Sequence, residues 1–221
     1  LAAGIGDLTP DVLRLDLAAE ADRIARWMVD TVANRLHKRG VVVAMSGGID
    51  SSCCAALAVH ALGPKKEFGL LLPERDSSAF SSDRGRMLAE HLGIEYVVND
   101  IAPALEGLGC YERRDEAIRR VFPEYGEGWK NKIVIAGGTE RGINFFKLVV
   151  QSPQGQTFEK RLPVKDYLQI VAATNFKQRI RKTMEYYHAD RLNYAVIGTP
   201  NRLEYDQGFF VKNGDGAADL K

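Results

Sequence analysis

The spacing of apolar residues changes along the chain, and it predicts whether each segment forms a helix or a strand. Residues 41–45 are apolar throughout and rich in valine, which is typical of a strand buried on both faces of a parallel sheet. After a short loop of small polar residues, the segment 53–62 is apolar over the length of a helix and contains neither glycine nor proline. We therefore expect a strand, a tight turn and a helix in direct succession.

Further strands and helices alternate along the rest of the chain. Strands are predicted over residues 68–72, 94–98 and 194–198, and helices over residues 81–92 and about 167–191. Strands that alternate with helices in this way are the pattern of an α/β fold. We expect a doubly wound parallel sheet of Rossmann-like type with helices on both faces, whose ligands lie beyond the carboxyl ends of the strands.

The first helix is predicted from an amphipathic pattern over residues 11–38, in which apolar side chains recur near helical spacing between charged ones. Pro10 suits the first turn of such a helix, and Gly40 suits its end. An amphipathic helix of this kind normally packs on a core. Its length also leaves room for contact with a partner subunit.

The pattern changes between about residues 107 and 165, where glycine, proline and charged residues become more frequent. Residues 147–151 and 157–162 flank a Ser-Pro-Gln-Gly-Gln turn and predict a β-hairpin. Gly137-Gly138-Thr139 lies within this stretch, but no apolar run of helix length follows it, so a turn is the better interpretation. We predict one domain over residues 1–221, with an insertion at about 107–165.

Composition narrows the class of protein without naming a function. The 221 residues are 45% hydrophobic and 27% charged, and 30 basic residues balance 29 acidic ones, so charge gives no support for a nucleic-acid partner. Three cysteines form neither a disulfide framework nor a zinc pattern, which suits a reduced, cytoplasmic protein. No apolar segment approaches the ~20 residues that span a bilayer, and no signal-peptide pattern is visible, so no membrane partner is expected.

The loop after the first strand has the composition of a phosphate-binding turn. Gly47 and Gly48 permit a close approach of the backbone, so that several N–H groups can converge on one anion at the helix N-terminus. The hydroxyl groups of Ser46, Ser51 and Ser52 add further donors. The segment is therefore a candidate site for the phosphates of a nucleotide.

Asp50 is the unexpected member of this loop, since a carboxylate repels a phosphate unless a divalent cation lies between them. A magnesium nucleotide resolves that conflict. The competing interpretation is a loop whose serines and glycines only cap a helix and form a turn. The agreement of strand, loop and helix favours phosphate binding.

Three other polar segments are candidates for the walls of the same site. The loop 72–78 follows the second strand and could bound an adenosine, although a solvated loop fits about as well. The helical segment 175–182 concentrates four cations in six residues, which suits either a clamp for an anion or a solvated basic face. The loop 208–219 contains three glycines, two carboxylates and a lysine.

These motifs resemble those of a known enzyme family. The segment 46–51 reads S-G-G-I-D-S, which lacks the lysine of a Walker A loop and resembles the S-G-G-x-D-S pyrophosphate loop of the N-type ATP pyrophosphatases. With the basic helix and the glycine-rich loop in that order, the chain resembles the ammonia-dependent NAD synthetases, in a subclass with a longer insertion. The resemblance covers residues 41–99 and 175–219.

The resemblance implies an activity. Members of this family use ATP and ammonia to amidate deamido-NAD, which gives NAD, AMP and pyrophosphate through an acyl-adenylate intermediate. ATP would be the co-substrate, Mg²⁺ the metal, and a homodimer the assembly. The four histidines are scattered and suggest no Ser-His-Asp or Cys-His arrangement, so we expect no nucleophilic residue.

The site residues of the family fall on matching positions of this chain. ATP would be bound by Ser46, Gly47, Gly48, Ile49, Asp50, Ser51, Ser52 and Thr199. Mg²⁺ would be held by Asp50 and Glu204, and deamido-NAD by Arg179, Lys212 and Asp219. Asp50 and Asp215 are the candidate catalytic residues, and Asp215 would hold ammonium or remove its proton.

Other interpretations stay open at this point. A ligase or thiolase of the same pyrophosphatase type could adenylate another acceptor, including RNA, although Cys53 and Cys54 lie inside a predicted helix and are poorly placed for sulfur transfer. A non-catalytic nucleotide-binding protein is a second alternative. The chain begins at Leu1 and stops at Lys221, where the family normally continues, so either it is a fragment or the remainder comes from elsewhere.

Overall fold

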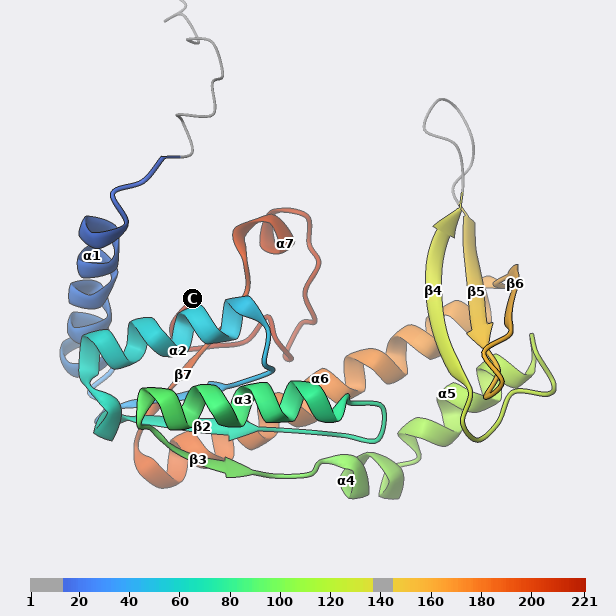
Figure 1. The fold of residues 1–221 in the computed structure, drawn as a ribbon, viewed down its shortest axis with the longest axis horizontal. Coiled ribbons are helices and arrows are strands. Elements are labelled where there is room, and N and C mark those ends of the chain that lie inside the picture. The colour runs from blue at the N-terminus through green and yellow to red at the C-terminus, as the bar shows by residue number, and fades with distance from the viewer. Residues whose placement is uncertain (1–13, 137–144) are drawn as a thin grey trace, which may run out of the picture.

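The computed structural model describes residues 14–136 and 145–221, and its centre is a four-stranded parallel sheet (Figure 1). The strands lie in the order β3-β2-β1-β7, so the first strand of the chain is central. Their bounds are β1 Val41–Ala44, β2 Glu67–Leu71, β3 Glu95–Val98 and β7 Ala195–Ile197. The four predicted strands are confirmed, each to within one residue at either end.

Helices cover both faces of this sheet, which confirms the doubly wound α/β fold. One group comprises α1 Leu17–Asp30, α2 Ile49–Leu62 and α3 Ala79–Leu92, and the other α4 Ala102–Gly107, α5 Cys110–Arg119 and α6 Val164–Leu192. Along β1, Val41 and Val43 pack with the first group and Val42 packs with the second. Within the described residues, none of these helices has the length and apolarity that a bilayer crossing requires.

The N-terminal helix begins later than the predicted 11–38 helix. Asp16 is its N-cap and accepts a hydrogen bond from the Ala19 N–H at 3.1 Å, so regular winding starts at the next residue. After α1 the chain widens into a five-residue π-helical segment, η2 Thr31–Arg35. The expected position of Pro10 in the first turn is wrong for this helix, and Pro10 itself lies outside the described residues.

Gly40 does not end the helix, contrary to expectation. It lies directly before β1, where a Cβ would collide with the Lys66 carbonyl and the Tyr194 ring. Its small size therefore serves the packing of three chain segments at the start of the sheet.

Between β3 and α6 the chain leaves the central sheet and forms a second, antiparallel sheet (Figure 1). Its strands are β4 Lys130–Ala136, β5 Phe145–Gln151 and β6 Thr157–Arg161, in that order. The β5-β6 pair confirms the predicted hairpin, whereas β4 was not predicted. The turn predicted at Gly137-Gly138-Thr139 lies outside the described residues, and the division into one domain with an insertion stays a prediction.

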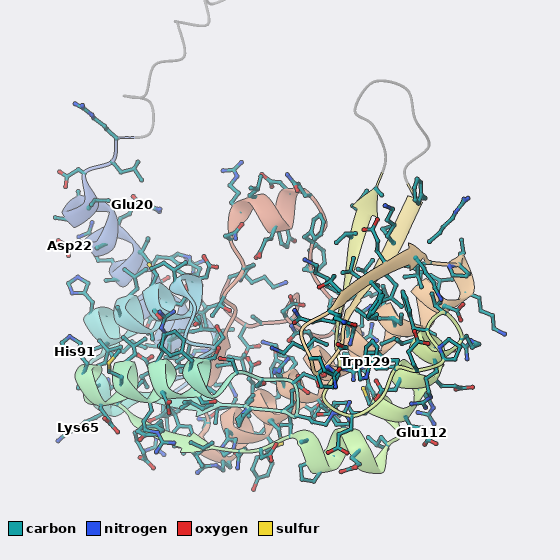
Figure 2. All side chains as sticks on the ribbon, turned by 45° about the vertical axis from the view of Figure 1, so that its right-hand side comes forward. Glu20, Asp22, Lys65, His91, Glu112 and Trp129 are labelled. Atoms are coloured by element: carbon teal, nitrogen blue, oxygen red, sulfur yellow. The ribbon has the colours of Figure 1, made fainter. Side chains whose placement is uncertain are left out.

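A separate hydrophobic core joins this second sheet to α5 and to the first half of α6. Leu148 and Val150 of β5 pack with Ile118 of α5 and Ile170 of α6. Trp129, labelled in Figure 2, packs against the same cluster just before β4. Because α6 contributes to both cores, it connects the second sheet to the central one.

One short helix, α7 Arg202–Asp206, follows β7 and was not predicted. Asn201 caps it by accepting a hydrogen bond from the Glu204 N–H at 2.9 Å, and the Glu204 carboxylate accepts one from the Asn201 N–H at 3.3 Å. This reciprocal capping fixes the Glu204 carboxylate at the start of α7.

The side chain of Glu67, the first residue of β2, is buried. It is 2% exposed, and neither of its carboxylate oxygens has a hydrogen-bond partner among the described residues. Burial raises the pKa of Glu67 from the ordinary value of 4.5 to about 8. The carboxyl is therefore neutral in the folded protein near neutral pH, because an ionised group here would have no compensating contact.

Replacing Glu67 with Gln is expected to change how stability depends on pH. The unfolded chain ionises this group above pH 4.5, while the folded chain keeps it neutral up to about pH 8, so native stability falls as the pH rises across this window. The Glu67→Gln variant lacks this loss. Relative to the native protein it should gain on the order of a few kcal/mol between about pH 5 and about pH 9, since one pKa unit corresponds to about 1.4 kcal/mol.

Urea denaturation at a series of pH values measures this difference. Glu95→Gln is the matched control, because Glu95 is the first residue of the neighbouring strand β3 and is exposed. The control should follow the native protein at every pH. A Glu67→Gln variant that also runs parallel to the native protein would contradict the neutral buried carboxyl.

Candidate active site

A cavity of about 470 Å³ opens at the carboxyl ends of three neighbouring strands, β1, β2 and β7. The segments that follow these strands line it, together with one face of α6. The sequence-predicted residues that line it are Ser46, Gly48, Asp50, Ser51, Thr199, Glu204 and Asp215. Those outside its lining are Gly47, Ile49, Ser52, Arg179, Lys212 and Asp219. This edge of the sheet is where a doubly wound fold binds its ligands.

The turn after β1 is held in shape by its own serines. The hydroxyl oxygens of Ser46 and Ser51 lie 3.1 Å apart, and the Gly48 N–H donates to Ser46 Oγ at 3.3 Å. The Gly48 carbonyl accepts hydrogen bonds from Ser51 Oγ at 3.1 Å and from Ser52 Oγ at 2.8 Å. Ser51 and Ser52 therefore shape the turn from within, while Ser46 is exposed at the cavity.

Gly47 makes this turn possible. Its φ of +75° is left-handed, and a Cβ on it would lie 2.5 Å from the Ser81 carbonyl oxygen in the first turn of α3. Gly48, the N-cap of α2, contributes no side chain to satisfy the N–H groups of the first turn. These groups can bind a ligand at the cavity, and the helix dipole favours a negatively charged one.

Three carboxylates at the cavity are candidates for holding a metal ion or ammonium. Asp50 lies in the first turn of α2, Glu204 lies in the first turn of α7, and Asp215 accepts a hydrogen bond from the Val211 N–H at 2.7 Å. No group of three or more His, Cys, Asp or Glu side chains that could hold a metal occurs within the described ranges. Mg²⁺ does not require one, since it commonly takes one or two carboxylates together with substrate phosphates and waters. The oxygen donors of Asp50 and Glu204 fit an ion bound in that way.

The basic segment of α6 reaches the cavity through one helical face. The residues of that face are Gln178, Arg181, Lys182 and Glu185. Arg179, the cation selected from the sequence, lies outside this face, and its Nε donates to the Lys212 carbonyl at 3.1 Å. The sequence signal for the face that lines the cavity is the i, i+3, i+4, i+7 spacing of these four polar residues.

The other residues predicted to contact a substrate already have partners within the chain. Asp219 Oδ2 accepts a hydrogen bond from the Val196 N–H at 2.8 Å, and Oδ1 accepts one from the Tyr186 hydroxyl at 3.3 Å. Asp219 thereby fastens the last residues of the chain to β7. Arg179 and Lys212 are brought together, but neither they nor Asp219 converge in the cavity, and their role toward a dinucleotide stays a prediction.

The loop after β2, a predicted candidate wall, lines the cavity with Pro73, Ser77 and Ser78. Ion pairs hold it to α5 and α6. Lys177 Nζ contacts Glu74 Oε1 at 3.1 Å and Asp76 Oδ2 at 2.6 Å, and Arg114 also contacts Asp76. Burial alone would raise the pKa of Asp76, but hydrogen bonding to Lys177 and the charge of Arg114 lower it to about 2. Ion pairs therefore connect the loop after β2 to α5 and α6, the two helices that pack under the second sheet.

Two serines of α3, Ser81 and Ser82, also line the cavity and were not selected from the sequence. The four serines among residues 77–82 were a visible signal, of which only the first two belong to the predicted wall 72–78. Serines are also common in solvated loops and helix caps, so the second pair alone does not indicate a site.

Comparison with known proteins gives a consistent picture. A family model for NAD synthase matches residues 20–119 and 140–221. An NH(3)-dependent NAD(+) synthetase from Rhizobium rhizogenes is 57% identical over 215 residues, which cover 97% of this chain and 65% of the relative. The enzyme of the same name from Rhizobium meliloti is 58% identical, with 96% of this chain and 63% of the relative covered. The chain thus spans slightly less than two thirds of the length of these relatives.

Solved structures share the fold. The structure of NMN synthetase from Francisella tularensis has a TM-score of 0.61 at 25% identity, and the match covers 94% of this chain and 64% of that one. An NH3-dependent NAD synthetase from Campylobacter jejuni, in complex with the nitrate ion, has a TM-score of 0.59 at 23% identity, with 93% and 66% covered. The second likeness concerns the fold alone.

Substituting Gly47 with Ala is expected to destabilise the protein more than the same substitution at Gly93. Their φ angles are +75° and +69°, so both variants incur roughly 1–2 kcal/mol of backbone strain. Only at Gly47 does the new Cβ also meet an atom, the Ser81 carbonyl oxygen at 2.5 Å, whereas Gly93 faces open space. Urea denaturation of both variants should show the larger loss for Gly47→Ala. Equal losses would show that α3 moves freely away from the turn.

Proposed function

Because this chain belongs to the NAD synthase family, we propose that it carries the ATP site of an enzyme that amidates deamido-NAD with ammonia. The products would be NAD, AMP and pyrophosphate, formed through an acyl-adenylate intermediate. The observation that carries the proposal is the 46–52 turn, which brings the N-terminus of α2 and Asp50 to a cavity at the carboxyl edge of the sheet. The names of relatives at 57% and 58% identity support the choice of reaction.

Adenylation accounts for the need for ATP. Ammonia cannot displace oxide from a carboxylate, so the acceptor carboxylate first attacks the α-phosphorus of ATP and pyrophosphate leaves. The N–H groups and hydroxyls of the 46–52 turn would stabilise the negative charge that grows on pyrophosphate. Ammonia then attacks the acyl carbon, the C–N bond forms, and AMP departs with the electrons of the broken C–O bond.

The carboxylates and Thr199 complete the proposed site. Asp50 and Glu204 would hold Mg²⁺, which when bound offsets charge on the phosphates. Thr199, which follows β7 and lines the cavity, would contact the nucleotide. Asp215 would hold ammonium or accept its proton, and its bond to the Val211 N–H would keep the carboxylate in place.

The dinucleotide would be bound at the rim of the cavity. Arg179, Lys212 and Asp219 are the proposed contacts, and the Arg179–Lys212 contact already places two of them side by side. A homodimer and a cytoplasmic location belong to the same proposal. The first rests on the family resemblance, and the second on that resemblance and on three free cysteines.

A mononucleotide acceptor is the second candidate. The chain shares its fold with NMN synthetase from Francisella tularensis at a TM-score of 0.61, which is the observation that supports this candidate. The same adenylation chemistry would apply, because the nicotinate carboxylate is unchanged and only the remote half of the acceptor is missing.

A single assay separates these candidates. The protein is incubated with ATP, magnesium and ammonium, and with either deamido-NAD or the nicotinate mononucleotide, while AMP, pyrophosphate and the amide product are measured. Equal amounts of AMP, pyrophosphate and NAD with deamido-NAD are expected. An amide product formed from the mononucleotide but not from deamido-NAD would select the second candidate. ATP cleavage at a rate that does not depend on either acceptor would overturn the proposal.

The variant Asp50→Asn is expected to fold but to lose magnesium-dependent AMP formation by a factor of about 100, because it removes a charged ligand close to the phosphates. Asp50 is exposed at the cavity, so its loss leaves the core intact. Asp83→Asn, on the exposed side of α3 and outside the cavity, is the matched control and should keep native turnover. Undiminished turnover in Asp50→Asn would remove the metal role from this residue.

A further inference from the structure

A buried ion pair on α6 has no role in the mechanism described above. Lys182 Nζ donates to Glu185 Oε2 at 2.6 Å, and the two residues are 6% and 4% exposed. Both residues also line the cavity at the carboxyl ends of the strands. Burial raises the pKa of Glu185, and the charge of Lys182 acts against that rise. The site therefore contains a cation and an anion that are shielded from bulk water.

Stability alone is a poor explanation for this pair. Taking two charges out of water is unfavourable, and well-packed apolar residues are often as stabilising as a buried ion pair. The neighbouring α6 residues Ile180 and Met184, which pack on the central sheet, are apolar. The charged pair occurs where the same helix meets the cavity, which points to interaction with a ligand.

The phosphate-binding turn lacks the cation that such loops often carry. Residues 41–63 contain neither lysine nor arginine, whereas a Walker A loop directs a lysine at the phosphates. Among the cavity-lining residues in the described part of the chain, the cations are Arg181 and Lys182. Among the described residues, Arg181 and Lys182 of α6 are thus the candidates for a direct cationic contact to phosphates in this cavity.

The head group of Lys182 is held more firmly at the cavity than that of Arg181. Arg181 already donates from Nε to the Leu72 carbonyl and from Nη1 to the Gln178 side chain, both at 3.4 Å. An ammonium group has three N–H donors, and Glu185 Oε2 accepts from only one of them. The contact to Glu185 also limits the rotamers of a long side chain, so less conformational entropy is lost when an anion binds.

We propose that Lys182 binds the phosphate chain of ATP and the departing pyrophosphate, and that Glu185 positions the Lys182 ammonium group. The inference rests on the proposed ATP-dependent function and assigns to α6 the cation that the 46–52 turn lacks. The charge-assisted hydrogen bonds from Lys182 would strengthen as negative charge moves onto the pyrophosphate oxygens.

The test needs a variant that removes the cation without leaving a buried charge unpaired. Truncating Lys182 alone strands the Glu185 carboxylate and destabilises the fold, so Lys182→Met is combined with Glu185→Leu. Arg120→Gln is the control. Arg120, which follows α5, pairs at 2.7 Å with Asp166, and Asp166 lies in the first turn of α6, far along that helix from the cavity. If the double variant does not fold, Lys182→Gln takes its place, since its amide can still donate to Glu185.

Isothermal calorimetry with inorganic pyrophosphate and magnesium is the primary measurement, with AMP titrated separately. The double variant should bind pyrophosphate at least about tenfold more weakly, as expected for a lost charge-assisted contact, and bind AMP with native affinity. Arg120→Gln should match the native protein for both ligands. Native pyrophosphate affinity in the folded double variant would overturn the assignment, and so would a loss confined to AMP.

Glu185→Gln tests the positioning role. It keeps the Lys182 charge but weakens its anchor, so the Michaelis constant for ATP should rise while that for the acceptor stays unchanged. An equal effect on both constants would assign Glu185 a structural role only. Pyrophosphate binding requires no acceptor, so the Lys182 result stands even if deamido-NAD is not amidated, and the two proposals can fail separately.

Discussion

The candidate site depends on one backbone turn, at which Gly47 adopts a left-handed conformation between β1 and α2. A Cβ at this point would meet the Ser81 carbonyl oxygen, so the turn and the first turn of α3 are in close contact. The contact determines where α2 begins, and with it where the first-turn N–H groups and Asp50 meet the cavity. A larger residue here would have to move one of the two helix starts that border the site.

The helix α6 is the second element on which the site relies, because it belongs to both hydrophobic cores. Ile170, near its start, packs under the second sheet, and Ile180 packs on the central sheet. Between them, Lys177 binds Glu74 and Asp76 of the cavity wall. A shift of the second sheet would thus reach the cavity through α6, although β4, β5 and β6 lie apart from the central sheet (Figure 1).

Local sequence was sufficient where an element is specified by its own residues. The four parallel strands follow from apolar runs, and the tight turn at residues 46–52 follows from its glycines and serines. Local sequence did not predict an element correctly where contacts with other residues determine its bounds or its formation. The start of α1 depends on whether Asp16 or an earlier residue becomes the cap, and β4 forms because β5 offers it an antiparallel partner.

The sequence by itself determined the α/β fold, the turn at residues 46–52 and the presence of a basic segment on a helix. Only the tertiary structure decided which cations of that segment reach the cavity. The packing of α6 across β1 rotates Arg181 and Lys182 toward the strand ends and leaves Arg179 beside the Lys212 carbonyl. Arg179 and Arg181 are two positions apart on the helix and so differ in direction by more than a right angle. The sequence therefore gives the charges of this segment, and the orientation of the packed helix decides which of them line the cavity.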